Sequence, residues 1–541
     1  MLYNPIRLCI AVGVQVLAIV GLFLLKATTY LSPESLIYPC CCWVLVLFIW
    51  SLGSWFWVTR KLFDPYTIFL VSAILFNAGQ ALLEVFHLNR FGMLRGQFSA
   101  ATLSDTLFFI TFGLSAFHLG ALLSLVARNS ITAISTLRQP FKRDNSDSSS
   151  RKRRSIHLNP SPTLSQDTAE PLLDQASRRQ VGNVQPLDTS SGAVGIGWGL
   201  ASISVLPSIY VFLQSLQVVL TRGYEGLYQG EQETSAGALP SVIGEFLIPA
   251  AVFLLVGSSV KDSSVYSKRT RNIALGLMIL YVLSRLLLGQ RRKVGSAASA
   301  LVWLWHEWVA KLPATVVVGC AIALALIFPI VAASRNLAGQ QGNSLDALQT
   351  QLYGDSNPLV SMLTEMGGTM MTTAHTINLV PSTRPFQMGA DYGYALLTLV
   401  PNFFWKLHPT IERGLAGSWL TWAIDPEFAS RGGGYGYSFI AEAYLNFGWV
   451  GGPIALGVIG FLYTSLVLWA INSRSPARIA LIATFSVYFP FYARSEAALH
   501  VRALVWYAVM PYWGAVGIST WLDRQKIRFG ARRRPKSSWL R

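Results

Sequence analysis

The stretch RGGGYGYSFIAEAYLNFGWVGG, residues 431–452, combines an arginine, a carboxylate, a run of glycines and several aromatic residues directly ahead of a long apolar segment. An acid at a membrane boundary is costly to bury unless it is paired, so Glu442 is a functional candidate. The glycines allow a close approach of the backbone to a ligand. We therefore expect Glu442 to act as a general base or to position a substrate, with a structural salt bridge to a nearby arginine as the alternative.

Basic residues also recur at positions that the topology described below places outside the cytoplasm, against their usual bias toward the cytoplasmic side. Nearly all of them are arginines, whose planar fork matches phosphate oxygens better than the point charge of lysine does. This surplus predicts recognition of a phosphate ester, and snorkelling anchors at helix ends are the alternative. The set is Arg90, Arg95, Arg222, Arg291, Arg292, Lys293, Arg335, Arg384, Arg413, Arg431, Arg494 and Arg502.

Further candidates lie in and around the same external stretch. His375 and Asp391 could each serve as a general base, ranked after Glu442, and a purely structural histidine is the alternative. Tyr437 and Tyr444 could stack on sugar rings, and we group Asn446 with them as a sugar-binding candidate. An aromatic belt at the membrane interface would use the same tyrosines.

The sequence contains no pattern typical of a metal or nucleotide site. No His, Cys and Asp cluster has metal-ligand spacing, and there is no Walker, dinucleotide-binding or G-x-S-x-G motif. We therefore expect no metal and no cofactor, so that any catalysis depends on a substrate that is already activated.

The elements that position these residues are predicted to be membrane helices. Of 541 residues, 52% are hydrophobic and only 13% are charged, and the apolar residues form repeated runs of spanning length. The net charge of +17 is explained by basic loops that orient the spans, which makes nucleic-acid binding the weaker interpretation. An all-α polytopic membrane protein with about twelve helices is predicted. Their approximate limits are 6–25, 36–58, 66–86, 104–127, 194–220, 240–258, 272–289, 295–310, 313–333, 449–471, 478–496 and 503–521.

The distribution of lysine and arginine divides the chain into six parts with both termini in the cytoplasm. Residues 1–127 hold helices one to four, 128–193 a disordered basic cytoplasmic loop, and 194–335 helices five to nine. Residues 336–448 form a large external domain, 449–521 the last three helices, and 522–541 a basic tail. Within the external domain, the segment YGYALLTLVPNFF at 392–404 is too short to span and predicts a helix in the interface.

Two segments resemble a known family. GYSFIAEAYLNFGWVGGPIALGVIGFLY resembles the G-Y-S-x-x-x-E-x-Y-x-N-F-G-x-x-G signature of bacterial O-antigen polysaccharide polymerases of the Wzy type. LLLGQRR, at the end of a predicted helix, resembles the Gly-x-Arg element of the same family. The resemblance implies a GT-C-like membrane glycosyltransferase of the bacterial inner membrane, with its active site facing the periplasm.

The resemblance also implies the substrate and the partners. A growing glycan would leave undecaprenyl diphosphate and join a new lipid-linked repeat unit, with membrane lipids and a chain-length regulator as further partners. On this basis we expect Arg291, Arg292, Arg384, Arg431 and Arg494 to bind the diphosphate. The diphosphate linkage stores the activation energy, so the polymerase needs neither ATP nor a metal.

Two other functions stay open at this point. An O-antigen ligase makes the same kind of bond but transfers the glycan to lipid A-core. A lipid-linked oligosaccharide transporter performs no chemistry and would show broken helices, charges at the midplane and internal repeats. We find no convincing repeat, and the external domain is larger than a carrier needs.

Overall fold

The structure is a computed structural model that describes residues 3–27, 32–89, 92, 94, 96–137, 188–227, 235–260, 265–337, 357–402 and 404–532. Its contacts define a larger unit, Met1–Asn129 with Asp188–Arg541, and a smaller unit, Ser130–Leu187. Most of the predicted basic loop at 128–193 lies outside the described residues, as do Arg90 and Arg95. All sites discussed below lie within the larger unit.

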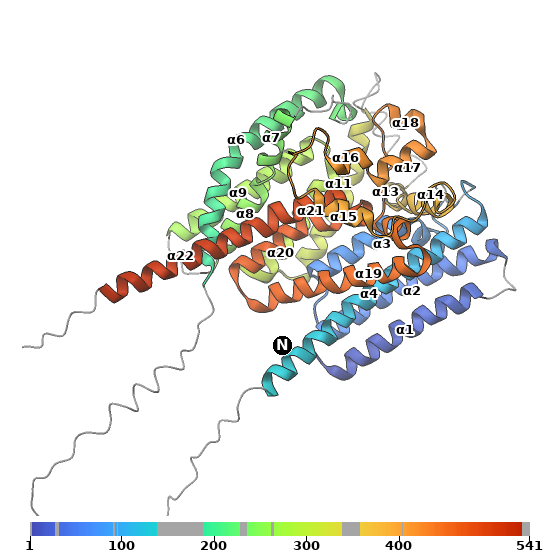
Figure 1. Ribbon diagram of the computed structural model, residues 1–541, viewed down its shortest axis with the longest axis horizontal. Helices are drawn as coiled ribbons and strands as arrows, with labels where there is room; N and C mark the ends of the chain where they lie inside the picture. Colours follow the sequence, from blue (N-terminus) through green and yellow to red (C-terminus); the bar gives the residue numbers. More distant parts are fainter. Residues whose placement is uncertain are drawn as a thin grey trace, which may run out of the picture. The chain divides into compact units, whose positions relative to one another are not determined.

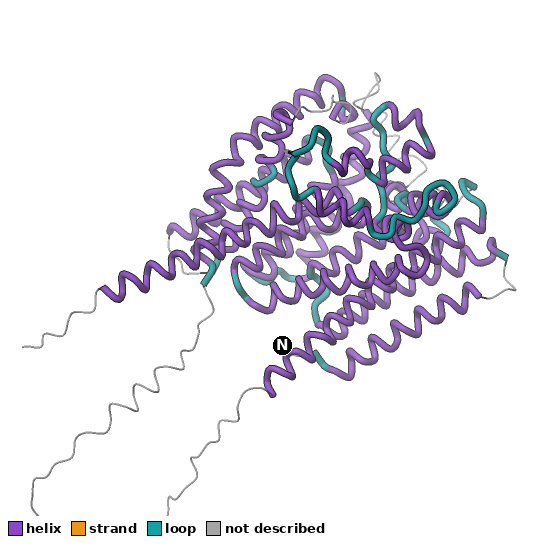
Figure 2. Tube along the Cα trace, in the orientation of Figure 1, coloured by secondary structure: helices purple, strands orange, loops and turns teal. Residues whose placement is uncertain are grey.

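The described residues form helices, turns and loops, and no strand is found among them (Figures 1 and 2). The helices of the first part of the chain are α1 Pro5–Ala27, α2 Pro33–Thr59, α3 Pro65–Val85, α4 Ala100–Leu137, α6 Ser190–Arg222, α7 Ser235–Gly244, α8 Leu247–Ser258, α9 Val265–Leu287, α10 Arg291–Leu304 and α11 Ala314–Leu337. Two single turns complete this part, the 3₁₀ turn η1 Tyr224–Leu227 and the π turn η2 Trp305–Val309.

The second part contains many short helices before the chain returns to long ones. They are α13 Pro358–Gly367, α14 Met370–Leu379, α15 Ala390–Leu397, α16 Pro409–Arg413, α17 Ala416–Ile424, α18 Pro426–Ser430, α19 Phe439–Ser473, α20 Pro476–Tyr488, α21 Ala497–Leu504 and α22 Met510–Arg532. The 3₁₀ turn η3 Phe489–Arg494 follows α20, and the π turn η4 Val505–Val509 follows α21. The predicted interfacial helix at 392–404 is the shorter α15, and a loop follows it.

Eight helices within the described residues are long and apolar enough to cross a membrane, and they match eight of the twelve predicted runs. The other four runs are shorter or interrupted. The run at 295–310 is α10 followed by η2, and the run at 478–496 divides into α20 and η3. The run at 503–521 crosses from α21 through η4 into α22, and that at 313–333 contains the shorter apolar stretch Ala314–Leu324. The chain is therefore a polytopic helical membrane protein.

Helix α19 differs from the predicted element at its start. It begins at Phe439, where Ser438 accepts hydrogen bonds from the backbone N–H groups of Ile440 and Ala441, at 3.1 and 3.4 Å. Glu442 thus lies in the first turn of a helix rather than in a loop before a span that starts at 449. At Gly448 the backbone takes φ 66° and ψ −156°, which kinks the helix between a short buried segment and the long apolar one.

Glycines bring α19 into direct backbone contact with α4. A Cβ atom built on Gly120 would lie 1.9 Å from the carbonyl oxygen of Gly457, and one on Gly460 would lie 2.1 Å from that of Phe117. Such small residues let membrane helices pack at close range, where van der Waals contact replaces the hydrophobic effect. This contact fixes the long helix whose first turn carries Glu442.

We predict that Gly120→Ala destabilises the protein, because even one methyl group must push α4 away from α19. The expected loss is about 1–3 kcal/mol, measured as a lower melting temperature of the purified protein in detergent. Gly199→Ala in α6 is the matched control, since nothing lies within 4 Å of its Cβ position. That control should stay within about 1 kcal/mol of the wild type. Equal melting temperatures for both variants would contradict the packing.

Candidate active site

Three chain segments meet where α19 begins. The Ser438 hydroxyl donates to Asn77 Oδ1 of α3 at 2.5 Å, and Asn77 Nδ2 donates to the carbonyl of Ala493 in η3 at 2.8 Å. Asn77 and Ser438 are fully buried, so these bonds replace contacts with water that both side chains have lost. The pairing ties the start of α19 to the segment that leads into α21.

Glu442 is held as a buried carboxylate by the segment that joins η3 to α21. Its side chain is 1% exposed, and the backbone N–H of Ala497 lies 3.0 Å from both carboxylate oxygens. The Tyr492 hydroxyl donates to Oε2 at 3.0 Å. Ala497 is the first residue of α21, and the N-terminus of a helix favours negative charge. Within the described residues Glu442 forms no ion pair with an arginine, so the salt-bridge alternative for this acid does not hold.

Glu496 is a second buried carboxylate beside the first. It is 4% exposed and accepts hydrogen bonds from the backbone N–H groups of Ala416 and Gly417, at 2.7 and 3.2 Å, at the start of α17. Burial raises the pKa of Glu496 to about 7. Glu496 and Glu442 are near enough to interact electrostatically, and Ala497 directly follows Glu496. Glu496, in the segment FYARSEAALHVR, is not among the site residues predicted from the sequence.

Asp391 completes the acidic group from α15, but it is already paired. Arg413 donates to Asp391 Oδ1 from Nε at 3.2 Å and from a terminal nitrogen at 3.0 Å. Asn446 Nδ2 donates to the other carboxylate oxygen at 3.1 Å and to the backbone carbonyl of Glu442 at 2.8 Å. Asn446 therefore links Asp391 to the turn that carries Glu442. These contacts favour a positioning role for Asp391 and Asn446 over the predicted roles as base and sugar ligand.

Two of the predicted arginines lie next to the acids. Arg384 is near enough to Glu496 to interact electrostatically, and its guanidinium lies 4.6 Å from the centre of the Trp419 ring. Arg494 ends η3, directly before the Ser495–Glu496 connection, and its guanidinium lies 5.9 Å from the centre of the Phe76 ring. Arg384 therefore lies close to one of the two carboxylates, and Arg494 lies two residues before Glu496 in the chain.

The other three arginines predicted to bind the diphosphate have different surroundings. Arg291, the first residue of α10, forms a double hydrogen bond with Glu365 at 2.7 and 3.2 Å. Arg292 is exposed and near enough to His500 of α21 to act on it electrostatically. Arg431 is two-thirds exposed and lies 3.5 Å from Glu427 one helical turn away. The structure thus brings Arg292 toward α21 but leaves Arg431 at the surface in a local pair.

Three further predicted residues are packed into the protein. Tyr437 and Tyr444 are 1% and 2% exposed, and their hydroxyls lie 3.2 Å from Thr376 Oγ1 and 3.4 Å from the Val380 carbonyl. Both rings are packed against protein in this structure, and their stacking on a sugar stays a prediction. His375 is half-buried against the ring of Phe98, at 4.7 Å between ring centres, and burial lowers its pKa. No hydrogen bond within the described residues joins His375 to the acids.

The described residues contain no group of three or more His, Cys, Asp and Glu side chains arranged to hold a metal ion. What the site offers is a pair of buried carboxylates, Glu442 and Glu496, with guanidinium groups beside them. Such a pair can take up a proton from a hydroxyl group while the arginines attract a phosphate.

We predict that Glu496 makes stability depend on pH. Its pKa is about 7 in the folded protein against an ordinary 4.5, so between these values the folded state binds a proton that the unfolded state releases. Stability from this group is therefore lost as the pH rises from about 4.5 to about 7. In Glu496→Gln the melting temperature should fall less over that range than in the wild type. Glu427→Gln, a change at an exposed acid, is the control and should keep the wild-type slope. Equal slopes in all three proteins would contradict the assignment.

Comparison with known proteins identifies the family. The family model described as O-antigen polysaccharide polymerase Wzy matches residues 190–524, more than half of the chain and the part that contains Glu442, Glu496 and the predicted arginines other than Arg90 and Arg95. The searches of curated proteins and of solved structures find no match, so the GT-C-like relationship stays a prediction. From the family match, the chain belongs to the O-antigen polysaccharide polymerase Wzy family.

Proposed function

We propose that this polymerase joins oligosaccharide repeat units carried on undecaprenyl diphosphate at the periplasmic face of a bacterial inner membrane. Membership of the family supports polymerisation of lipid-linked oligosaccharide by a membrane glycosyltransferase. The observation that carries the finer proposal is the buried Glu442, held by the Ala497 N–H and the Tyr492 hydroxyl next to Glu496. Both termini would lie in the cytoplasm, because most lysine and arginine residues then fall on that side.

The proposed reaction moves a glycan from one lipid carrier to another. A hydroxyl oxygen at the non-reducing end of the acceptor attacks the anomeric carbon of the growing glycan. The bond between that carbon and the diphosphate oxygen breaks, and its electron pair leaves with the lipid diphosphate. The hydroxyl proton passes to a carboxylate of the Glu442 and Glu496 pair. Atoms and charges balance without a further reactant, because the diphosphate is already a good leaving group.

Glu442 suits the role of base because its position is fixed before the substrate arrives. The Ala497 N–H and the Tyr492 hydroxyl hold both carboxylate oxygens, so little reorganisation is needed when the acceptor hydroxyl approaches. Glu496, with its pKa raised to about 7, can exchange a proton near neutral pH. We therefore propose that the two acids share the proton taken from the acceptor.

The arginines serve the departing diphosphate. The proposed phosphate ligands are Arg384, which acts on Glu496, Arg494, at the end of η3, and Arg291 and Arg292, at the start of α10. To bind the diphosphate, Arg291 must give up its ion pair with Glu365. That glutamate is half exposed. We leave Arg431 out of the proposed set, because its guanidinium lies at the surface beside Glu427. Guanidinium groups placed where negative charge develops lower the barrier without a metal ion.

We predict that Glu442→Gln abolishes elongation of a synthetic undecaprenyl-diphosphate-linked repeat unit by the purified protein. Losing the base should slow turnover by at least about 100-fold, because proton transfer contributes that much or more. Glutamine has the shape of glutamate and can still accept the hydrogen bond from the Ala497 N–H. A loss of activity in a folded Glu442→Gln protein therefore reports the loss of the base. Glu427→Gln is the matched control at an exposed site and should elongate like the wild type.

The glycans made by cells that carry these variants give an independent test of the proposed base. Cells whose only copy is Glu442→Gln should carry core capped with a single repeat unit, whereas loss of a ligase leaves the core uncapped. Long glycan ladders from Glu442→Gln would contradict the proposed base. Uncapped core in cells that lack the protein would favour the ligase, and wild-type protein that moves the lipid without lengthening the glycan would favour the transporter.

A further inference from the structure

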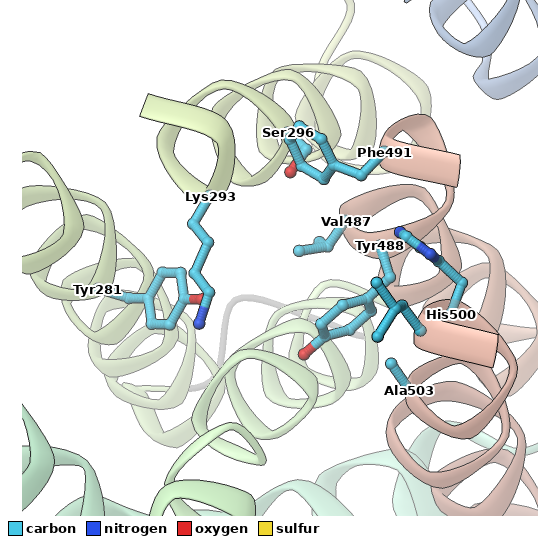
Figure 3. A pocket seen from close by; sticks show the side chains of 9 residues that line it. Tyr281, Lys293, Ser296, Val487, Tyr488, Phe491, His500 and Ala503 are labelled. Carbon is cyan, nitrogen blue, oxygen red and sulfur yellow. The ribbon is translucent and has the colours of Figure 1, made fainter. Parts of the chain in front are cut away.

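A cavity of about 110 Å³ lies between α9, α10, the end of α20 and α21 (Figure 3). Lys293 and Tyr281 stand on one side, and Tyr488, His500 and Ala503 stand on the other. Apart from Lys293, Ser296 and His500, the lining consists of aromatic and aliphatic side chains, which are Tyr281, Val487, Tyr488, Phe491, Leu499 and Ala503. The cavity is thus an apolar space with a few polar groups at its edge, the usual composition of a small-molecule site.

The size of the cavity suits a short piece of branched hydrocarbon. An apolar cavity of roughly 150 Å³ can hold benzene, which has six carbon atoms. By that scale 110 Å³ accommodates a unit of about five carbons. One isoprene unit has this size, and its methyl branch would pack against the aromatic rings of Tyr488 and Phe491.

The edge of the cavity carries an excess of positive charge. Lys293 forms an ion pair with Glu245, and the same carboxylate is 3.1 Å from Arg285. One acid therefore faces two cations. Arg292, which forms no ion pair within the described residues, adds a third positive charge close to His500. His500 itself stays neutral near pH 7, because burial lowers its pKa to about 4. This edge would attract an anionic group attached to the hydrocarbon.

Helix α21 connects the cavity to the two acids. Its first residue, Ala497, binds Glu442, and Glu496 directly precedes it. His500 lies one turn further on, with Nδ1 3.3 Å from the Glu496 carbonyl, and its ring lines the cavity. One helical turn is about 5.4 Å long. Along α21, the residue that binds Glu442 and the residue that lines the cavity are thus about one turn apart, a rise that a diphosphate can span.

We propose that this cavity receives the first isoprene unit of the polyprenyl diphosphate, so that the diphosphate lies along Arg292 and Lys293 and the anomeric carbon reaches Glu442. The inference rests on the proposed function and adds the lipid-binding residues to it. A free diphosphate could use the same cations, but it would gain nothing from an apolar cavity. The preference for a prenyl chain is therefore the property to measure.

The test measures binding of farnesyl diphosphate and of inorganic diphosphate to protein in nanodiscs, with empty nanodiscs as the baseline. The wild type should bind farnesyl diphosphate at least about tenfold more tightly, because each buried CH₂ group strengthens binding. Ala503→Phe should lose this preference by filling the cavity. Ala423→Phe is the matched control at an exposed position of α17 and should keep it. Ser296→Leu fills the cavity from α10 and gives an independent variant if Ala503→Phe fails to fold.

The results separate this inference from the proposed function. The inference is overturned if the folded filled variants bind farnesyl diphosphate as tightly as Ala423→Phe does, or if the wild type shows no preference over inorganic diphosphate. Elongation of a synthetic lipid-linked repeat by the wild type is measured on the same preparations. Elongation without a prenyl preference would leave the polymerase proposal standing and reject the cavity. A prenyl preference that the filled variants lose, without any elongation by the wild type, would support the cavity and reject the polymerase proposal.

Discussion

The hydrogen bonds from the Ala497 backbone N–H to the Glu442 carboxylate are the contact on which the site depends. A buried acid without partners would be costly in a membrane protein, and here the N-terminus of α21 and Tyr492 supply those partners. The contact also determines where other elements lie. Because Ala497 follows Glu496, holding Glu442 places the second carboxylate beside the first and directs it to the start of α17.

The site also depends on the balance of charge around Glu442 and Glu496. Asp391 is neutralised by Arg413, which leaves Glu442 and Glu496 as the carboxylates that interact mainly with backbone N–H groups and a hydroxyl. Arg384 is close enough to Glu496 to act on it electrostatically, yet within the described residues no ion pair joins Arg384 to either acid. A site arranged in this way keeps both a proton acceptor and a phosphate-binding group available, which a directly paired glutamate and arginine would not.

Much of the fold could be predicted from the sequence, because a long apolar run in a lipid bilayer must form a helix to satisfy its backbone hydrogen bonds. The eight longest spans, the family and the importance of the stretch around Glu442 follow from composition and from the G-Y-S and N-F-G segments. Glu496 could not be found in this way, since nothing in the pattern SEAALH distinguishes a buried acid from an exposed one. The bond between Asn77 and Ser438 joins residues 361 positions apart, and only the folded chain reveals it. The burial of Tyr437 and Tyr444 could not be predicted either, because rings that pack inside a protein and rings that face a ligand have the same residue type.

The central claim is that Glu442 and Glu496 act as one unit, and a double-mutant cycle on turnover tests it most directly. The rates of the wild type, Glu442→Gln, Glu496→Gln and the double variant are measured with one synthetic lipid-linked repeat and converted to free energies. If the two acids share a proton, the second substitution costs little once the first has been made, and the double variant turns over about as slowly as the slower single variant. If instead the rate losses of the two single variants multiply in the double variant, their free energies of activation add. The acids would then act independently, which would contradict the account.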